Sequence, residues 1–138
     1  MNEDGCIFCK IAKGEIPCNK IYEDDKVLAF LDIQPVSDGH TLVIPKSHFG
    51  TFDMCPVEIM SKLAGCAGKI AVAVASAMEA DGYNILCNNG KAAGQLVDHV
   101  HFHIIPRKKG DGVFSHWPAY KYEKGQAKVF AEKICEKL

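Results

Sequence analysis

Three histidines alternate with apolar residues in Asp98-His-Val-His-Phe-His-Ile-Ile-Pro106. On a β-strand, side chains two positions apart share one face, so His99, His101 and His103 would lie side by side while the residues between them face the core. The chain holds six histidines in 138 residues, and chance is a weak explanation for three of them at this spacing. The segment is therefore the first candidate for a site of chemistry.

Three interpretations of this histidine face remain open at this point. It could be a solvated strand face that is rich in histidine. It could be an open zinc site with several imidazole ligands, as in metal hydrolases. It could also divide the work, with some imidazoles on a metal and one attacking a substrate. A neutral imidazole is a competent nucleophile near pH 7 and a good leaving group afterwards, which suits two-step transfer at phosphorus.

Cys6 and Cys9 form the only Cys-x-x-Cys pair among seven cysteines. This spacing lets two thiolates face one tetrahedral metal ion. It also suits a redox dithiol, but such pairs normally follow a strand, and nothing strand-like precedes Cys6. Two thiolates with two imidazoles would complete a closed structural site, and His48 is a further candidate ligand. One histidine of the triad would join it, which leaves the other two for organic chemistry.

Composition sets the frame for these residues. The chain has 138 residues and 15.1 kDa, the size of one domain spanning residues 1–138, and 48% hydrophobic with 24% charged residues is typical of a globular protein. A net charge of −1 offers no broad basic field for nucleic acid or an acidic membrane. The first residues are polar, unlike a signal peptide, and the longest apolar run is short for a membrane span. The odd number of cysteines argues against a disulfide framework, so we expect a soluble protein of a reducing compartment.

Hydrophobic periodicity and punctuation predict the elements that position these residues. We expect strands without regular βαβ alternation, and hence an α+β fold with an antiparallel sheet. The expected helices cover residues 5–13, 56–80 and 120–138, a hairpin covers 21–23 with 27–33, and further strands cover 41–44, 83–87 and 99–105, the last stopped by Pro106.

The triad with its upstream strand resembles the histidine-triad (HIT) superfamily, and more specifically the Hint branch of histidine-triad nucleotide-binding proteins. The match extends over almost the whole chain. It includes Cys-Ile-Phe-Cys-Lys-Ile, Gly-Glu-Ile-Pro, Gly-His-Thr-Leu-Val-Ile-Pro-Lys-Ser-His, Ala-Gly-Gln, the triad followed by Ile-Ile-Pro, and His-Trp-Pro. The resemblance implies a five-stranded antiparallel sheet with one long helix and a short or C-terminal helix. It also implies a homodimer in which two sheets join into a continuous ten-stranded sheet, with the long helix packing across the two-fold axis.

The activity implied by the resemblance is hydrolysis of nucleoside 5′-monophosphoramidates, in which AMP is joined to an amine or to lysine. His101 would attack the α-phosphorus to give a covalent nucleotidyl-histidine, which water then resolves. His103, His40 and Gln95 would donate to phosphate oxygens, and the carbonyl of His99 would orient the ring of His101. The same resemblance implies a structural Zn²⁺ held by Cys6, Cys9, His48 and His99.

For the purine nucleoside, the resemblance implies that the carboxylate of Asp32 takes the ribose hydroxyls and that Asn88 lies near the phosphate. Trp117, within His-Trp-Pro, would reach the site of the other subunit. The base would be clamped by apolar side chains, namely Phe8, Ile11, Ile16, Phe30, Leu31 and Ile33.

Two departures from the Hint pattern stand near the triad. Leu96 occupies a position where many Hint proteins have a serine that helps to protonate the leaving amine, and Asp98 replaces an aromatic residue or proline. The alternative functions are dinucleoside polyphosphate hydrolysis or nucleotidyl transfer, a nucleotide-binding regulatory adaptor with little turnover, and a hydrolase that uses zinc in its chemistry. We expect a cytoplasmic protein, with the nucleus as an additional location.

Overall fold

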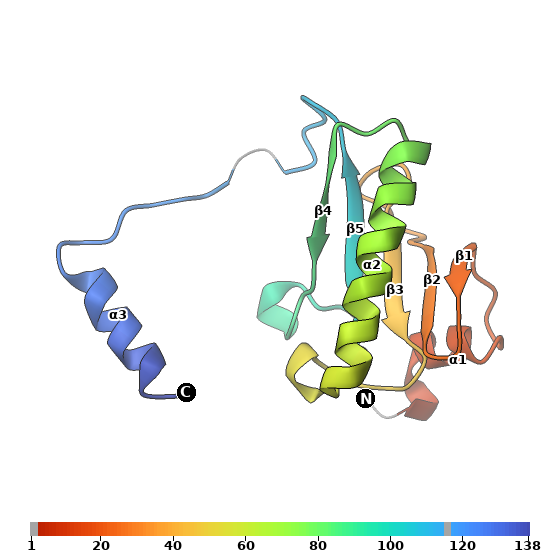
Figure 1. The fold of residues 1–138 in the computed structure, drawn as a ribbon, viewed down its shortest axis with the longest axis horizontal. Coiled ribbons are helices and arrows are strands. Elements are labelled where there is room, and N and C mark those ends of the chain that lie inside the picture. Colours follow the sequence, from red (N-terminus) through yellow and green to blue (C-terminus); the bar gives the residue numbers. More distant parts are fainter. Residues whose placement is uncertain (1–2, 115–116) are drawn as a thin grey trace.

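The computed structural model describes residues 3–114 and 117–138, and its centre is an antiparallel sheet in the order β1-β2-β3-β5-β4 (Figure 1). The strands are β1 (Lys20–Glu23), β2 (Val27–Leu31), β3 (Thr41–Pro45), β4 (Gly82–Leu86) and β5 (Phe102–Arg107). The helices are α1 (Ile7–Ala12), α2 (Val57–Ala77) and α3 (Gln126–Cys135), with 3₁₀ turns at Glu3–Gly5, Phe52–Met54 and Lys91–Ala93. The predicted α+β class with a five-stranded antiparallel sheet is confirmed.

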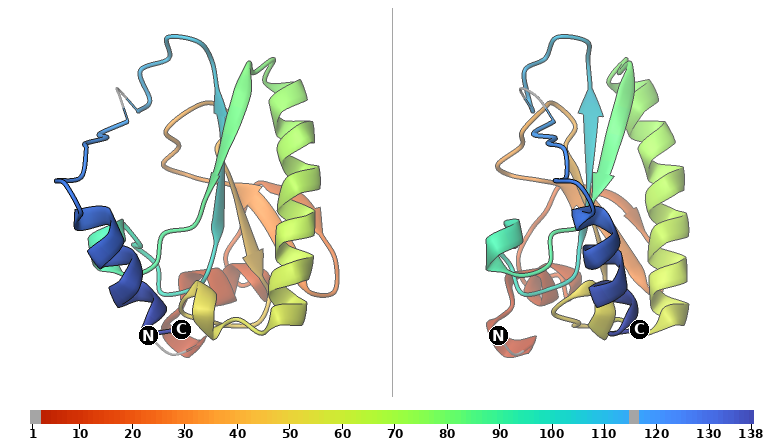
Figure 2. Two further views of the ribbon diagram at one scale, coloured as in Figure 1. Left: turned by 60° about the vertical axis from the view of Figure 1, so that its left-hand side comes forward. Right: turned by 90° about the vertical axis from the view of Figure 1, so that its left-hand side faces the viewer.

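Period-two alternation divides the core into two layers. Side chains on one face of the sheet pack against α2, and those on the other face pack near α1 (Figures 1 and 2). The α2 layer includes Val27, Ala29, Val43, Phe102 and Ile104, whereas the α1 layer includes Cys6, Phe8, Cys9, Leu28, Phe30, Leu42 and Ile44. Because Phe102 and Ile104 face α2, the intervening His103 faces the α1 side.

Helix α2 begins directly after Pro56, a residue that favours a helix start because it fixes φ and lacks an N–H. Leu63, Ala67, Ile70 and Val74 recur at helical spacing and are buried against the sheet. In the part of the chain that the structure describes, α2 is the one helix long and apolar enough to cross a membrane. One stripe of it is buried against the sheet, and 28% of its apolar window is buried.

The predicted strand over residues 99–105 begins too early. β5 begins at Phe102, which pairs with Val43 of β3, so His103 is the one triad histidine on the strand. The next ladder positions on β3 lead to Pro45, which has no N–H to donate. The carbonyl of Pro45 accepts instead from the ring of His99 at 2.8 Å. His99 and His101 therefore lie in an extended segment that approaches the strand.

The same strand also continues past its predicted stop. Pro106 lies within β5 and pairs with Tyr83 of β4, beyond the last β3–β5 pair, Thr41 with Ile104. A proline there costs no ladder bond to β3, because β3 does not extend that far.

The C-terminal helix is shorter than predicted. α3 begins at Gln126, after Gly125 with its positive φ of 79°, and not at Tyr120. No residue of α3 is buried, and Figure 1 shows it apart from the sheet at the end of an extended stretch. An isolated helix of this length is marginal in water.

Candidate functional site

A cavity of about 410 Å³ opens on the α1 side of the sheet and collects most of the predicted site residues. Its walls include ten of them: Phe8, Ile11, Ile16, Phe30, Leu31, Asp32, Ile33, His40, His101 and His103. A larger cavity of about 500 Å³, beside Met78 and Pro106, has no imidazole or thiol among the described residues that line it. We therefore assign the chemistry to the smaller, mostly apolar cavity.

His101 is buried, and its orientation is fixed by the backbone. Its Nδ1 lies 2.6 Å from the carbonyl oxygen of His99 and donates to it, because a carbonyl can only accept. Burial lowers the pKa of His101, which favours the neutral ring. With the proton on Nδ1, the neutral ring keeps a lone pair on Nε2. The ring also makes a T-shaped contact with Phe8, with centroids 5.2 Å apart.

His103 lies beside His101, with ring centroids 4.8 Å apart, and contacts His40 on its other side. The Nδ1 of His103 is 2.8 Å from the Nε2 of His40. Burial, followed by the proximity of His101 and His40, lowers the pKa of His103 to about 4. Burial also lowers the pKa of His40. All three cavity histidines are thus disposed to be neutral near pH 7.

Asp32 is held at the start of a loop that returns to His40. The N–H of Asp32 donates to the carbonyl of His40 at 2.9 Å, and the N–H of Gln34 donates to the Oδ1 of Asp32 at 2.9 Å. Its Oδ2 lies 3.7 Å from the Nε2 of His40. The carboxylate is therefore a fixed acceptor in the cavity wall, close to the imidazoles.

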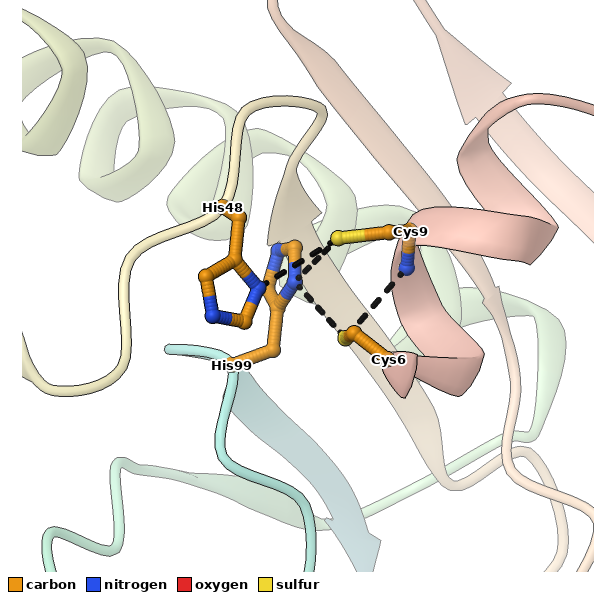
Figure 3. A group of neighbouring side chains, drawn as sticks. All are labelled: Cys6, Cys9, His48 and His99. Carbon is orange, nitrogen blue, oxygen red and sulfur yellow. Dashed lines mark hydrogen bonds between the residues drawn. The ribbon is translucent and has the colours of Figure 1, made fainter. Parts of the chain in front are cut away.

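Behind the cavity, two thiols and two imidazoles converge (Figure 3). The Nδ1 of His99 lies 3.4 Å from the Sγ of Cys6 and 3.5 Å from that of Cys9, and the Nδ1 of His48 lies 3.3 Å from the Sγ of Cys9. Ligands about 2.0–2.3 Å from a tetrahedral zinc ion are roughly 3.5 Å from one another. The four residues, brought together from three separate segments, can hold a metal ion.

The ring of His99 already has the tautomer that ligation requires. Its Nε2 donates to the carbonyl of Pro45, so Nδ1 keeps the lone pair toward the thiols. Burial lowers the pKa of His99 to about 4. Burial and the neighbouring Cys6 raise the pKa of Cys9 to about 12, so ligation, which needs the thiolate, would release a proton.

Asp32, His40 and His103 form a second close group of metal-ligand types. Its hydrogen bonds argue against a metal ion there. The N–H of Val36 donates to the Nδ1 of His40 at 3.1 Å, so the proton of the neutral ring is on Nε2. That nitrogen has no lone pair for a metal, and the group is better described as a hydrogen-bonded chain.

Besides the four predicted metal ligands, three predicted site residues lie outside the cavity lining. Both ends of the Gln95 amide are occupied: Oε1 accepts from the N–H of Gly90 at 2.8 Å, and Nε2 donates to the carbonyls of Gly50 and Val97 at 2.7 and 3.0 Å. Asn88 donates to the carbonyl of Gly94 at 3.4 Å. Trp117 is 88% exposed on the segment that leads to α3, and His116 lies outside the described residues.

Sequence reasoning missed two backbone groups that organise the site, the N–H of Val36 and the carbonyl of Pro45. Side-chain patterns carry no signal for such groups. It also missed several lining residues, among them Pro17, Cys18, Leu42 and Val97. Leu96, noted as a departure from the Hint pattern, lies in the lining and is 88% exposed.

Known proteins resemble this chain in both sequence and fold. The adenosine 5′-monophosphoramidase of Schizosaccharomyces pombe is 43% identical over 134 residues, which cover 96% of this chain and 98% of that protein. A crystal structure of a HIT family protein from Bacillus subtilis superimposes with a TM-score of 0.88 at 42% identity, covering 97% of each chain.

A Zn-bound histidine triad family protein from Mycobacterium smegmatis superimposes with a TM-score of 0.76 at 34% identity, covering 99% of this chain and all of that one (100%). The model of the HIT domain matches residues 13–110, which include the loop from Asp32 to His40 and the complete triad. The chain therefore belongs to the HIT domain family.

Proposed function

We propose that this protein hydrolyses the P–N bond of a purine nucleoside 5′-monophosphoramidate, with His101 as the nucleophile. The observation that supports this most directly is the 2.6 Å bond from the Nδ1 of His101 to the carbonyl of His99, which leaves the Nε2 lone pair for the cavity. The name of the yeast relative, an adenosine 5′-monophosphoramidase, supports the substrate class.

The proposed reaction has two displacements at phosphorus. The Nε2 of His101 attacks the α-phosphorus, the P–N bond to the amine breaks, and the departing amine takes up a proton. Water then attacks the phosphorus of the nucleotidyl-histidine and gives up one proton, which replaces the proton that the amine carried away. The P–Nε2 bond breaks, and the nucleoside monophosphate leaves with His101 again neutral and its lone pair again on Nε2. The amine's proton must come from a donor other than residue 96, because the leucine there has none to give.

The remaining walls suit the rest of a nucleotide. His103 lies next to the nucleophile, where an N–H stabilises charge that develops on a phosphate oxygen. The two carboxylate oxygens of Asp32 match the vicinal hydroxyls of a ribose. Flat apolar surface for a purine is available on the walls formed by Phe8, Ile11, Ile16, Phe30, Leu31 and Ile33.

We assign the Cys6, Cys9, His48 and His99 cluster to a structural Zn²⁺. Four protein ligands close a tetrahedral site and leave no position for an activated water. When bound, the ion would tie α1 to the segment that presents His101. A thiolate pair of this kind fits a reducing compartment, and we propose the cytoplasm.

We also propose a homodimer. β4 is an edge of the sheet, and its Tyr83 and Ile85 are 43% and 41% exposed, so this edge is apolar and accessible in the part of the chain that the structure describes. The outward face of α2 carries small residues, Ala64 and Gly65 among them, that permit close approach of a second helix.

The test of the proposed function is release of AMP from adenosine 5′-phosphoramidate by the wild-type chain and by His101→Ala, with AMP binding measured in parallel. We expect multiple turnovers by the wild type, none by the variant, and AMP binding by both. Equal release by both proteins would exclude His101 as the nucleophile. AMP binding without release by the wild type would favour a regulatory nucleotide-binding protein.

A further inference from the structure

A backbone amide determines which nitrogen of His40 carries the proton. The N–H of Val36 points at the Nδ1 of His40 from 3.1 Å, and an amide N–H can only donate. Nδ1 must therefore be the bare nitrogen of the ring. His40 is 3% exposed, and burial disfavours its charged form, so the single proton of the neutral ring is on Nε2.

The same reasoning then applies to His103. The Nε2 of His40 lies 2.8 Å from the Nδ1 of His103, and as the protonated atom it is the donor of that bond. The Nδ1 of His103 is consequently the acceptor, and the proton of a neutral His103 is on Nε2. This is the nitrogen left to the cavity that His103 lines.

We propose that His40 is a positioning residue that acts through His103: anchored by the Val36 amide, it holds His103 with its Nε2–H toward a phosphate oxygen of the substrate. This inference rests on the proposed function and changes the role expected for His40, which the family resemblance made a direct phosphate donor. Both ring nitrogens of His40 are engaged inside the protein, so neither is free for a substrate.

The arrangement gives two adjacent imidazoles opposite polarity. In His101, the carbonyl of His99 takes the Nδ1 proton and leaves a lone pair on Nε2. In His103, the chain from Val36 through His40 does the reverse and leaves an N–H on Nε2. The rings are 4.8 Å apart, so a lone pair for the phosphorus and a donor for its oxygen are presented together. With the other tautomer, His101 would lose the Nε2 lone pair that attacks phosphorus, and His103 would lose the Nε2–H that donates to the phosphate oxygen.

Two substitutions of His40 separate positioning of His103 from support of the loop. The amide nitrogen of a glutamine lies near the place of the histidine Nε2, so His40→Gln keeps a donor for His103 but loses the acceptor for Val36. The amide oxygen of an asparagine lies near the place of Nδ1, so His40→Asn keeps the acceptor for Val36 but does not reach His103. The two variants therefore exchange which of the two hydrogen bonds is kept.

The first readout needs no substrate. Long-range ¹H–¹⁵N spectra of the free protein, labelled at histidine, distinguish a proton on Nδ1 from one on Nε2. We expect the Nε2–H form of His103 in the wild type and in His40→Gln, and a mixture of the two forms in His40→Asn. A wild-type His103 with its proton on Nδ1 overturns the proposal, whatever the activity of the protein is.

The second readout is the kinetics of phosphoramidate hydrolysis. For His40→Asn we expect kcat to fall by at least about tenfold. The fall should be smaller than the ~10²–10³-fold loss that follows deletion of an oxyanion donor, and KM should stay within about twofold of the wild-type value. His40→Gln should recover most of kcat. Recovery by asparagine and not by glutamine would assign His40 to the loop and overturn the proposal. An inactive wild type with the expected His103 tautomer would count against the proposed function alone.

Discussion

The carbonyl oxygen of His99 accepts the Nδ1–H of His101 at 2.6 Å, while the ring of His99 belongs to the cluster with Cys6, Cys9 and His48. One residue thus belongs to the proposed metal site through its side chain and orients the proposed nucleophile through its main chain. A displacement of the His99 backbone would rotate the ring of His101. The two sites are coupled by geometry, and metal binding is expected to support activity through this backbone.

Removal of the metal should therefore act through stability. For zinc-loaded protein we expect a chelator to lower Tm by about 10 °C or more, because the binding free energy is lost from the folded state. Cys6→Ser should have a similarly low Tm with or without zinc, while Cys135→Ser, which changes an exposed cysteine outside the cluster, should behave as the wild type. Differential scanning calorimetry and AMP release measure the two effects. Loss of activity at unchanged Tm would indicate that zinc acts in the chemistry.

Asp32→Asn should weaken nucleotide binding more than it affects the chemical step. If the carboxylate accepts from the ribose hydroxyls, its loss removes hydrogen bonds to a charged acceptor, worth about 1.5–3 kcal/mol, or roughly tenfold to a hundredfold in Kd for AMP. Asp38→Asn is the matched control, because Asp38 is an exposed carboxylate of the same loop. Calorimetric titration with AMP provides the measurement. An unchanged Kd for Asp32→Asn would remove the carboxylate from the ribose site.

Much of the fold and the site follows from local patterns. The apolar run between Gly39 and Pro45 predicted the strand around Val43, alternation predicted the one around Phe102, and helical spacing predicted α2. The triad and the Cys-x-x-Cys pair were identified from residue type and spacing, and the family resemblance added the residues of the cavity wall. These features are predictable because the period of a strand or a helix is visible in the local sequence of that element.

The errors concern groups that depend on distant neighbours. The start of β5 is set by Pro45, which is remote in sequence and cannot continue the ladder, and no periodicity within residues 99–105 contains that information. The role of His40 depends on the amide of Val36, and every residue other than proline has such an amide. The three hydrogen bonds between the Gln95 side-chain amide and backbone groups likewise depend on the tertiary structure. That residues 1–138 form a single domain stays a prediction.

Asp24 should make stability depend on acid pH. Burial alone would raise its pKa, but hydrogen bonds from the N–H groups of Lys26 and Val27 and from the Tyr22 hydroxyl, with Lys62 nearby, hold that pKa well below its usual range. A lowered pKa in the folded state means that the stabilisation is complete above the unfolded-state value near pH 4 and is lost as the pH falls further.

We therefore expect Asp24→Asn to lower the free energy of unfolding by about 1–3 kcal/mol at pH 7 and by less at pH 3. Urea unfolding across this pH range measures the difference. Asp38→Asn controls for the removal of one negative charge from the chain. A deficit for Asp24→Asn that is as large at pH 3 as at pH 7 would contradict the assignment.

The proposed homodimer predicts a sharp effect of side-chain size on α2. Gly65 lies on the exposed face of the helix, and a Cβ added there meets nothing within 4 Å in the single chain. Gly65→Arg should thus leave the monomer folded, and arginine is the better helix former. If a second α2 packs against this face, the long charged side chain would prevent its approach.

Light scattering after size exclusion should give about twice the 15.1 kDa of the chain for the wild type and for Gly65→Ala, which adds one methyl group. Gly65→Arg should give the mass of one chain, with unchanged circular dichroism. The apolar edge of β4, with Tyr83 and Ile85, would then be uncovered together with α2, so the variant should also precipitate at lower concentration. A dimer that persists in Gly65→Arg would show that α2 lies outside the interface, and a wild-type mass of one chain would reject the homodimer altogether.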